Sequence, residues 1–73
     1  MWEKEFDTRK EALAANIKKI RLEKGLAQER LALEAGVDRT LVSKIERQIA
    51  NPSLEILVKL ATTLKVKIPT LLE

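Results

Sequence analysis

Residues 28–47 read QERLALEAGVDRTLVSKIER, and they are the most informative part of the chain. The pattern predicts two short helices that meet at Gly36, because glycine ends a helix in a left-handed conformation without steric cost. In the second helix, Val42 and Ile45 share one face. Polar side chains share another face: Arg39, Thr40, Ser43 and Lys44. Such a helix can bury one side and offer hydrogen-bonding groups on the other.

Paired helices of this kind are typical of the helix-turn-helix motif, whose second helix lies in the major groove of DNA. The rest of the chain is also predicted to be helical, since its apolar residues recur at helical spacing and strand-like alternation is absent. The predicted fold class is all-α. The five predicted helices cover residues 8–24, 28–35, 39–47, 53–64 and 68–72.

The first predicted helix has a recognisable start and end. Thr8-Arg9-Lys10-Glu11 fits a capping box, and Gly25 is a suitable stop after it. These signals divide the chain into an N-terminal extension, residues 1–7, and one domain, residues 8–73.

The later helices also carry local start signals. Asp38 is the predicted N-cap of the third helix, and either Ser53 or Asn51 is that of the fourth. Pro69 is tolerated in the first turn of the fifth helix, where its missing N–H is not needed.

The predicted core consists of the apolar positions that recur along the helices. Its main members are Leu13, Ile17, Ile20, Leu31, Val42, Ile45, Leu57, Leu60 and Leu64. The buried stripe of the fourth helix is predicted to comprise Leu54, Leu57, Leu60, Ala61 and Leu64.

Residues 1–7 allow several interpretations. Trp2 and Phe6 are four residues apart and are the only aromatic residues of the chain. They are placed to prolong an amphipathic helix, to fold back onto the domain, or to contact a second subunit. A frayed terminus is an equal alternative.

Composition excludes several classes of function. The 73 residues suffice for one small domain, and they include no Cys, His or Tyr. Zinc sites of the usual type and histidine-activated nucleophiles are therefore excluded, and we predict neither catalysis nor a metal or other cofactor. Apolar runs are too short to span a membrane, and the N-terminus lacks the apolar segment of a signal peptide, so we expect a soluble cytoplasmic protein.

The net charge of +3 is unevenly distributed. Residues 1–38 hold eight basic and eight acidic side chains, whereas residues 39–73 hold six basic and three acidic ones. All the excess positive charge thus lies at or after the third predicted helix. This distribution fits an anionic partner or an ordinary charged surface equally well.

From Leu13 to Leu72 the chain resembles the phage-repressor and Cro-like (XRE-type) helix-turn-helix family. The matching residues occur in family order without a gap: Ile20-Arg21, Lys24-Gly25, Gln28-Glu29-Arg30-Leu31-Ala32, Gly36-Val37, Ile45-Glu46-Arg47, Asn51-Pro52-Ser53-Leu54, Leu60-Ala61, Leu64 and Leu71-Leu72. The resemblance implies a compact five-helix bundle of the lambda-repressor-like DNA-binding type, with the helix-turn-helix at helices 2 and 3.

Within this family, a smaller set of residues looks like the controller proteins of restriction–modification systems: Asp38-Arg39-Thr40, Ser43 and Ile45-Glu46-Arg47. The chain also departs from the family pattern at two helix ends. Gln48 and Lys65 each stand where the family often has Gly. A residue other than Gly costs about 1 kcal/mol or more in a left-handed helix end, so the helix end at Gln48 is expected to differ in geometry.

The resemblance implies a role for each candidate site residue. Base edges in the major groove would be contacted by Arg39, Thr40, Ser43 and Lys44. Phosphates would be contacted by Gln28, Arg47 and Asn51. Arg21 and Glu46 would form a partly buried ion pair between helices 1 and 3. Apart from the resemblance, the leucines at the chain end suit a dimer surface that includes Ile68, Leu71 and Leu72, or else they close the core.

We therefore predict a sequence-specific regulator of transcription that binds double-stranded DNA as a homodimer with a two-fold symmetric operator. No small-molecule effector is expected. Two alternatives remain at this stage. One is an antitoxin that binds both DNA and a toxin partner. The other is a helical protein-interaction module that does not bind DNA, which would lack salt-dependent binding to duplex DNA.

Overall fold

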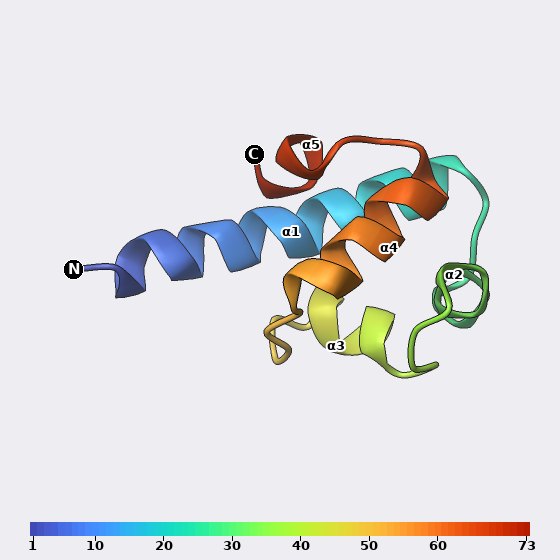
Figure 1. The fold of residues 1–73 in the computed structure, drawn as a ribbon, viewed down its shortest axis with the longest axis horizontal. Helices are drawn as coiled ribbons and strands as arrows, with labels where there is room; N and C mark the ends of the chain where they lie inside the picture. Colours follow the sequence, from blue (N-terminus) through green and yellow to red (C-terminus); the bar gives the residue numbers. More distant parts are fainter.

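The protein consists of five helices and no strand, as the sequence predicts (Figure 1). The structure is a computed structural model that describes residues 1–73. The helices are α1, Glu3–Glu23; α2, Gln28–Ala35; α3, Leu41–Glu46; α4, Leu54–Leu64; and α5, Ile68–Leu72. Helix α1 runs the length of the molecule and packs against α5 and α3, while α2 packs against α3 and α4. None of the five combines the length and apolar character that crossing a bilayer requires.

Helix α1 begins at Glu3, so the predicted start at Thr8 is wrong. The Thr8 hydroxyl donates to the Lys4 carbonyl over 2.9 Å, as it does inside a helix, and no capping box forms. The first turn carries Glu3 and Glu5, whose charges suit the positive end of the helix dipole. Most of the predicted N-terminal extension is therefore helical. It projects beyond the other helices in a molecule that measures 36 × 20 × 20 Å (Figure 1).

Helix α3 is shorter than predicted. It begins at Leu41 because Asp38 stabilises a turn instead of capping the helix. The Asp38 Oδ1 atom accepts hydrogen bonds from the backbone N–H of Thr40 over 2.8 Å and from its hydroxyl over 2.6 Å. An aspartate that bonds the residue two positions ahead mimics a backbone turn.

The predictions for α2, α4 and α5 are confirmed within one residue. Helices α2 and α5 have the predicted bounds, and α4 begins at Leu54, directly after its cap Ser53. The Ser53 Oγ atom accepts a hydrogen bond from the N–H of Ile56 over 3.2 Å, which satisfies a donor that the helix itself leaves free.

One core draws on all five helices. Its buried members are Leu13, Ile17, Leu31, Ala32, Ala35, Val42, Ile45, Leu60, Ala61, Leu64 and Leu71. Of the predicted core, Ile20 and Leu57 are only half-buried. The prediction is wrong for Leu54, which is 69% exposed because it lies at the edge of the apolar stripe in the first turn of α4.

The first four helices end in the same way. After each, one residue has positive φ: Gly25 at 68°, Gly36 at 71°, Gln48 at 62° and Lys65 at 60°. At α3, the N–H of Ile49 donates to the Lys44 carbonyl and that of Gln48 to the Ile45 carbonyl, both over 3.0 Å. This is the Schellman arrangement. The expectation that Gln48 would change the geometry of its helix end is therefore wrong, because Gln48 adopts the left-handed conformation despite its cost, as Lys65 does after α4.

Side chains of α1 hold α5 in place. Arg9 donates from Nη1 to the Leu72 carbonyl over 2.9 Å, and Asn16 donates from Nδ2 to the Leu71 carbonyl over 3.0 Å. The Leu71 side chain is fully buried in the core. Its predicted place in a dimer surface is therefore wrong, because a side chain covered within one subunit cannot also pack against another. Ile68 and Leu72 remain half-exposed.

Candidate functional site

The two faces of α3 differ as the sequence predicts. Val42 is 0% exposed and Ile45 is 2% exposed, and both belong to the core. On the opposite side, Thr40 and Lys44 are exposed and Ser43 is half-buried. Because the apolar face holds the helix against the bundle, the polar face stays available to a partner.

The orientation of α3 is set by the carboxylate of Glu46. Its Oε2 atom accepts from Nε of Arg21 over 2.8 Å, and its Oε1 atom accepts from Nη2 of Arg21 over 3.1 Å. The two side chains are 9% and 7% exposed. The structure thus contains the buried pair between α1 and α3 that the family resemblance implies. The planar guanidinium and the carboxylate meet edge to edge, which restricts rotation of α3 about its axis.

Two further groups complete this network. Arg21 donates from Nη1 to the Leu26 carbonyl over 2.7 Å, and Gln28 donates from Nε2 to Oε1 of Glu46 over 3.1 Å. No buried side-chain nitrogen or oxygen atom in the protein lacks a hydrogen-bond partner. The network therefore joins α1, the segment before α2, α2 and α3 through charges that are all compensated.

Gln28 thus has an internal partner that sequence reasoning missed. It is the first residue of α2 and is half-buried. Its amide nitrogen carries two hydrogens, so the bond to Glu46 leaves one donor for another acceptor. Gln28 can therefore donate to a ligand outside the protein while it donates to Glu46, the residue that orients α3.

The Asp38 carboxylate engages the hydroxyl of Thr40, which limits what Thr40 can do. Its hydroxyl hydrogen points at Asp38, so the side chain offers its methyl group and an accepting oxygen rather than a donor. The same hydroxyl is the main reason that the pKa of Asp38 lies below its ordinary value of 3.8, followed by the backbone N–H of Thr40 and the charges of Lys44 and Arg39.

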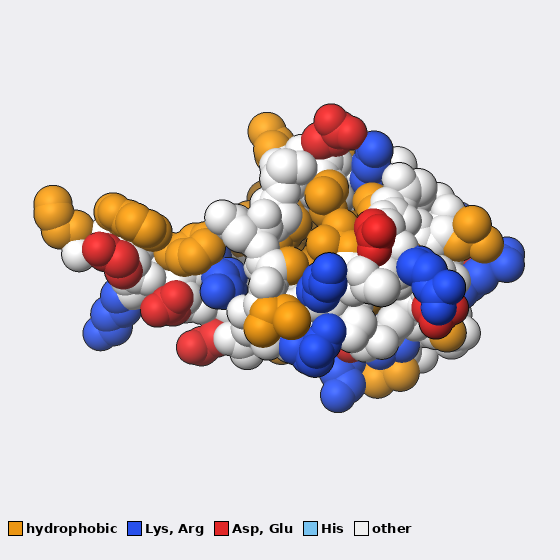
Figure 2. Space-filling view, turned by 90° about the horizontal axis from the view of Figure 1, so that it is seen from below, with side chains coloured by type: hydrophobic (Ala, Val, Ile, Leu, Met, Phe, Trp, Pro, Cys, Tyr) orange, Lys and Arg blue, Asp and Glu red, His pale blue; other side chains and the backbone are white.

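Arg39 lies in the turn before α3, and its side chain is 78% exposed. Its Nη2 atom is 3.5 Å from Oε1 of Glu29 in the first turn of α2. No sequence signal indicated this contact. Figure 2, which views the molecule from the side of α3, shows several basic side chains spread over this face with acidic ones among them.

The remaining predicted site residues lie beyond the end of α3. Arg47 is exposed, and its Nε atom makes only a long contact of 3.4 Å with the Ser43 carbonyl. Asn51 is exposed in the segment between α3 and α4. The structure thus brings Arg47 close to the polar face of α3, whereas Asn51 stands on the side of a separate pocket.

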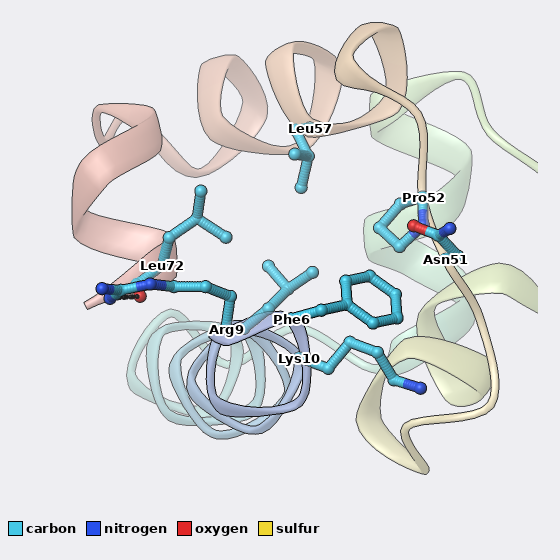
Figure 3. A pocket seen from close by; sticks show the side chains of 8 residues that line it. Phe6, Arg9, Lys10, Asn51, Pro52, Leu57 and Leu72 are labelled. Carbon is cyan, nitrogen blue, oxygen red and sulfur yellow. Dashed lines mark hydrogen bonds between the residues drawn. The ribbon is translucent and has the colours of Figure 1, made fainter. Parts of the chain in front are cut away.

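That pocket is small and lies between α1, α4, α5 and the segment before α4 (Figure 3). Its volume is 90 Å³, below the range of about 300–1,000 Å³ that is typical of ligand sites. The lining residues are Phe6, Arg9, Lys10, Leu13, Asn51, Pro52, Leu57 and Leu72. The ring of Phe6 contacts Trp2 edge-on at 5.9 Å and Nζ of Lys10 at 5.2 Å. Phe6 therefore packs against its neighbours on α1 and lines one side of the pocket.

The chain is similar to known regulatory proteins. A family model described as helix-turn-helix matches residues 17–71. The chain is 40% identical over 63 residues to the control protein C.SmaI of Serratia marcescens, spanning 86% of this chain and 75% of that protein. It is also 40% identical over 62 residues to the HTH-type transcriptional regulator SinR of Bacillus subtilis, spanning 84% of this chain and 56% of that protein.

A solved structure agrees with these similarities. The restriction–modification controller protein C.AhdI from Aeromonas hydrophila superimposes with a TM-score of 0.79 and 38% sequence identity. The match covers 89% of this chain and 96% of that one.

Proposed function

We propose, from the premise that this chain belongs to the helix-turn-helix family of the phage-repressor (XRE) type, that it reads a two-fold symmetric DNA operator as a homodimer. Family membership makes the chain a DNA-binding regulator of transcription, and the family is one of regulators rather than enzymes. How it reads DNA is the part that we infer from its surface.

The observation that carries the proposal is the polar face of α3. Lys44 is exposed on it, Arg39 and Thr40 are exposed in the turn that leads into it, and Val42 and Ile45 anchor the helix. An α-helix fits the major groove, and an arginine can donate two hydrogen bonds to O6 and N7 of guanine. We assign base contacts to this face, with the Thr40 methyl group suited to thymine and Ser43 allowing close approach.

Phosphate contacts would position the domain and supply most of the affinity. We assign them to Gln28 at the start of α2, to Arg47 after α3, and to Asn51. For Gln28, the second amide hydrogen is the donor that would reach the phosphate, since the first is bonded to Glu46.

A homodimer would match the two-fold symmetry that we propose for the operator. Each subunit would place α3 in one half-site, and the half-sites would lie about 34 Å apart, which is one turn of DNA. Ile68 and Leu72 are the half-exposed residues of α5 that we assign to the subunit contact.

The test is selection of bound duplexes from a random DNA pool by the whole chain, at about 150 mM salt, where the Debye length is about 8 Å. We expect a two-fold symmetric motif with half-sites one turn apart. Arg39→Ala combined with Lys44→Ala should abolish the motif, whereas Lys59→Ala should preserve it, because Lys59 is on α4 and pairs with Glu55 of the same helix.

A folded chain that enriches no motif would contradict the proposal. If, in addition, the chain shows no salt-dependent binding to duplex DNA, a protein-interaction module is favoured. An asymmetric motif with a monomeric complex would refute the homodimer alone.

A further inference from the structure

Glu29 stands directly beside the proposed base-reading arginine. The ion pair between Glu29 Oε1 and Arg39 Nη2 measures 3.5 Å and links the first turn of α2 to the turn before α3. The side chains are 71% and 78% exposed, so water and salt screen their attraction. Such a pair contributes little to the free energy of folding. We therefore ask how it affects the binding of DNA.

The other carboxylates of α2, α3 and the turn between them have hydrogen-bond or ion-pair partners other than Arg39, although the charge of Arg39 also acts on Asp38 within the turn. Asp38 bonds Thr40 within the turn, and Glu46 is buried against Arg21. Glu34 pairs with Arg30 on its own helix, with Nε and Oε2 2.7 Å apart. Glu29 is therefore the carboxylate whose ion-pair partner is a proposed base contact.

The geometry of a guanidinium makes this pairing selective. Arg39 has five N–H donors in a planar fork, and a guanine accepts two of them through O6 and N7. An arginine bound to guanine thus keeps donors for Glu29. A phosphate bound to Arg39 instead brings a second full negative charge close to the Glu29 carboxylate, and like charges repel.

We propose that Glu29 is a specificity-determining residue that acts through Arg39. Glu29 keeps the Arg39 guanidinium directed to base edges, and its charge disfavours the binding of Arg39 to phosphates. The affinity for random DNA is therefore lowered relative to the affinity for the operator. This inference rests on the proposed function, in which Arg39 contacts bases.

The test compares two duplexes of equal length, the selected motif and a scrambled version, by fluorescence anisotropy over a range of salt concentrations. For Glu29→Gln, we expect affinity for the scrambled duplex to rise about fivefold and affinity for the motif to change less than about twofold. The slope of log affinity against log salt on the scrambled duplex should steepen by about 0.9, since Arg39 gains one phosphate.

Glu34→Gln is the matched control, because it removes the same charge from the same helix while its partner is Arg30. It should leave the ratio of the two affinities unchanged. In an Arg39→Gln background, Glu29→Gln should also lose its effect on that ratio. Thermal unfolding verifies that each variant folds.

If Glu29→Gln and Glu34→Gln changed the ratio of the two affinities equally, the change in net charge alone would explain the result, and the inference would be overturned. A parallel rise in both affinities for Glu29→Gln would overturn it as well. If the wild-type chain selects a motif but its affinity ratio is insensitive to Glu29, only this inference fails. If the wild-type chain selects no motif, the proposed function fails and this inference with it.

Discussion

Gln28 of α2 donates a hydrogen bond to Glu46 of α3 over 3.1 Å, and the accepting oxygen is one that Arg21 of α1 also contacts. Gln28, which we propose to contact phosphate, is thus hydrogen-bonded to the Glu46 carboxylate, which orients α3. The two functions that we propose for the surface, positioning on the DNA backbone and base contact, would be linked through this one buried carboxylate.

The buried ion pair makes removal of one partner costly. Glu46→Ala leaves the Arg21 guanidinium buried without its carboxylate, so we expect a loss of about 3–5 kcal/mol in the free energy of unfolding. Replacing both residues with apolar ones, as in Arg21→Met with Glu46→Leu, should recover much of that loss. Urea unfolding measures both effects.

The exposed pair Arg30–Glu34 is the control for this prediction. Glu34→Ala should change the free energy of unfolding by less than about 1 kcal/mol. A similarly small change for Glu46→Ala would contradict the idea that α3 is oriented by a buried charge pair.

The left-handed helix ends offer a gain in stability. Gln48→Gly and Lys65→Gly should each raise the free energy of unfolding by about 1 kcal/mol, because glycine adopts φ near 60° without steric cost. Thermal unfolding should show a higher Tm for each variant.

Gly36→Ala is the converse variant. A Cβ at Gly36 would meet no atom within 4 Å, so its effect isolates the backbone conformation. We expect a loss of about 1 kcal/mol. If the glycine variants at residues 48 and 65 were destabilised, greater freedom of the unfolded chain would outweigh relief of the helix end.

Acid should loosen the turn between α2 and α3. The pKa of Asp38 is lowered on folding, chiefly by the Thr40 hydroxyl, so the ionised carboxylate stabilises the turn. That contribution is complete above the ordinary pKa of 3.8 and is lost as pH falls through the lower folded value. An NMR titration of Asp38 should show a midpoint below 3.8.

Thr40→Val keeps the shape and the backbone N–H of Thr40 but removes the hydroxyl. In this variant the Asp38 midpoint should move up towards 3.8, because the leading cause of the lowered pKa is gone. Identical midpoints in the two proteins would show that the hydroxyl does not act on Asp38 in solution.

Base and phosphate contacts should respond differently to substitution. Arg39→Ala should relax the sequence preference at one base pair of each half-site, at a cost of about 1–3 kcal/mol against the preferred base. Arg47→Ala should instead weaken motif and scrambled duplexes alike and flatten the salt slope by about 0.9. Titrations of a panel of single-base variants of the motif separate the two patterns, and a uniform loss for Arg39→Ala would contradict its assignment.

The two leucines that sequence reasoning misplaced provide a test of the core. Leu71→Ala should lower the free energy of unfolding by about 2–5 kcal/mol, because the Leu71 side chain is fully buried. Leu54→Ala should cost less than about 0.5 kcal/mol, since Leu54 is 69% exposed. Chemical denaturation of both variants checks the assignment, and equal losses would be incompatible with this packing.

Several features of this protein were determined by the sequence alone. The apolar spacing determined the helical class, Ser53 determined the start of α4, and Gly25 and Gly36 determined the ends of α1 and α2. Val42 and Ile45 determined which face of α3 is buried. Each of these features depends on side chains within one or two turns of each other, so it is encoded locally.

The way in which those helices meet became known from the folded structure. Glu46 lies 25 residues from Arg21 and 18 from Gln28, and their shared contact depends on the angles at which three helices pack. Glu29 reaches Arg39 across the turn for the same reason. The burial of Leu71 likewise depends on the packing of α5 against α1, where Asn16 donates to the Leu71 carbonyl. Periodicity assigns a side chain to a face of its helix, but packing alone decides what covers that face.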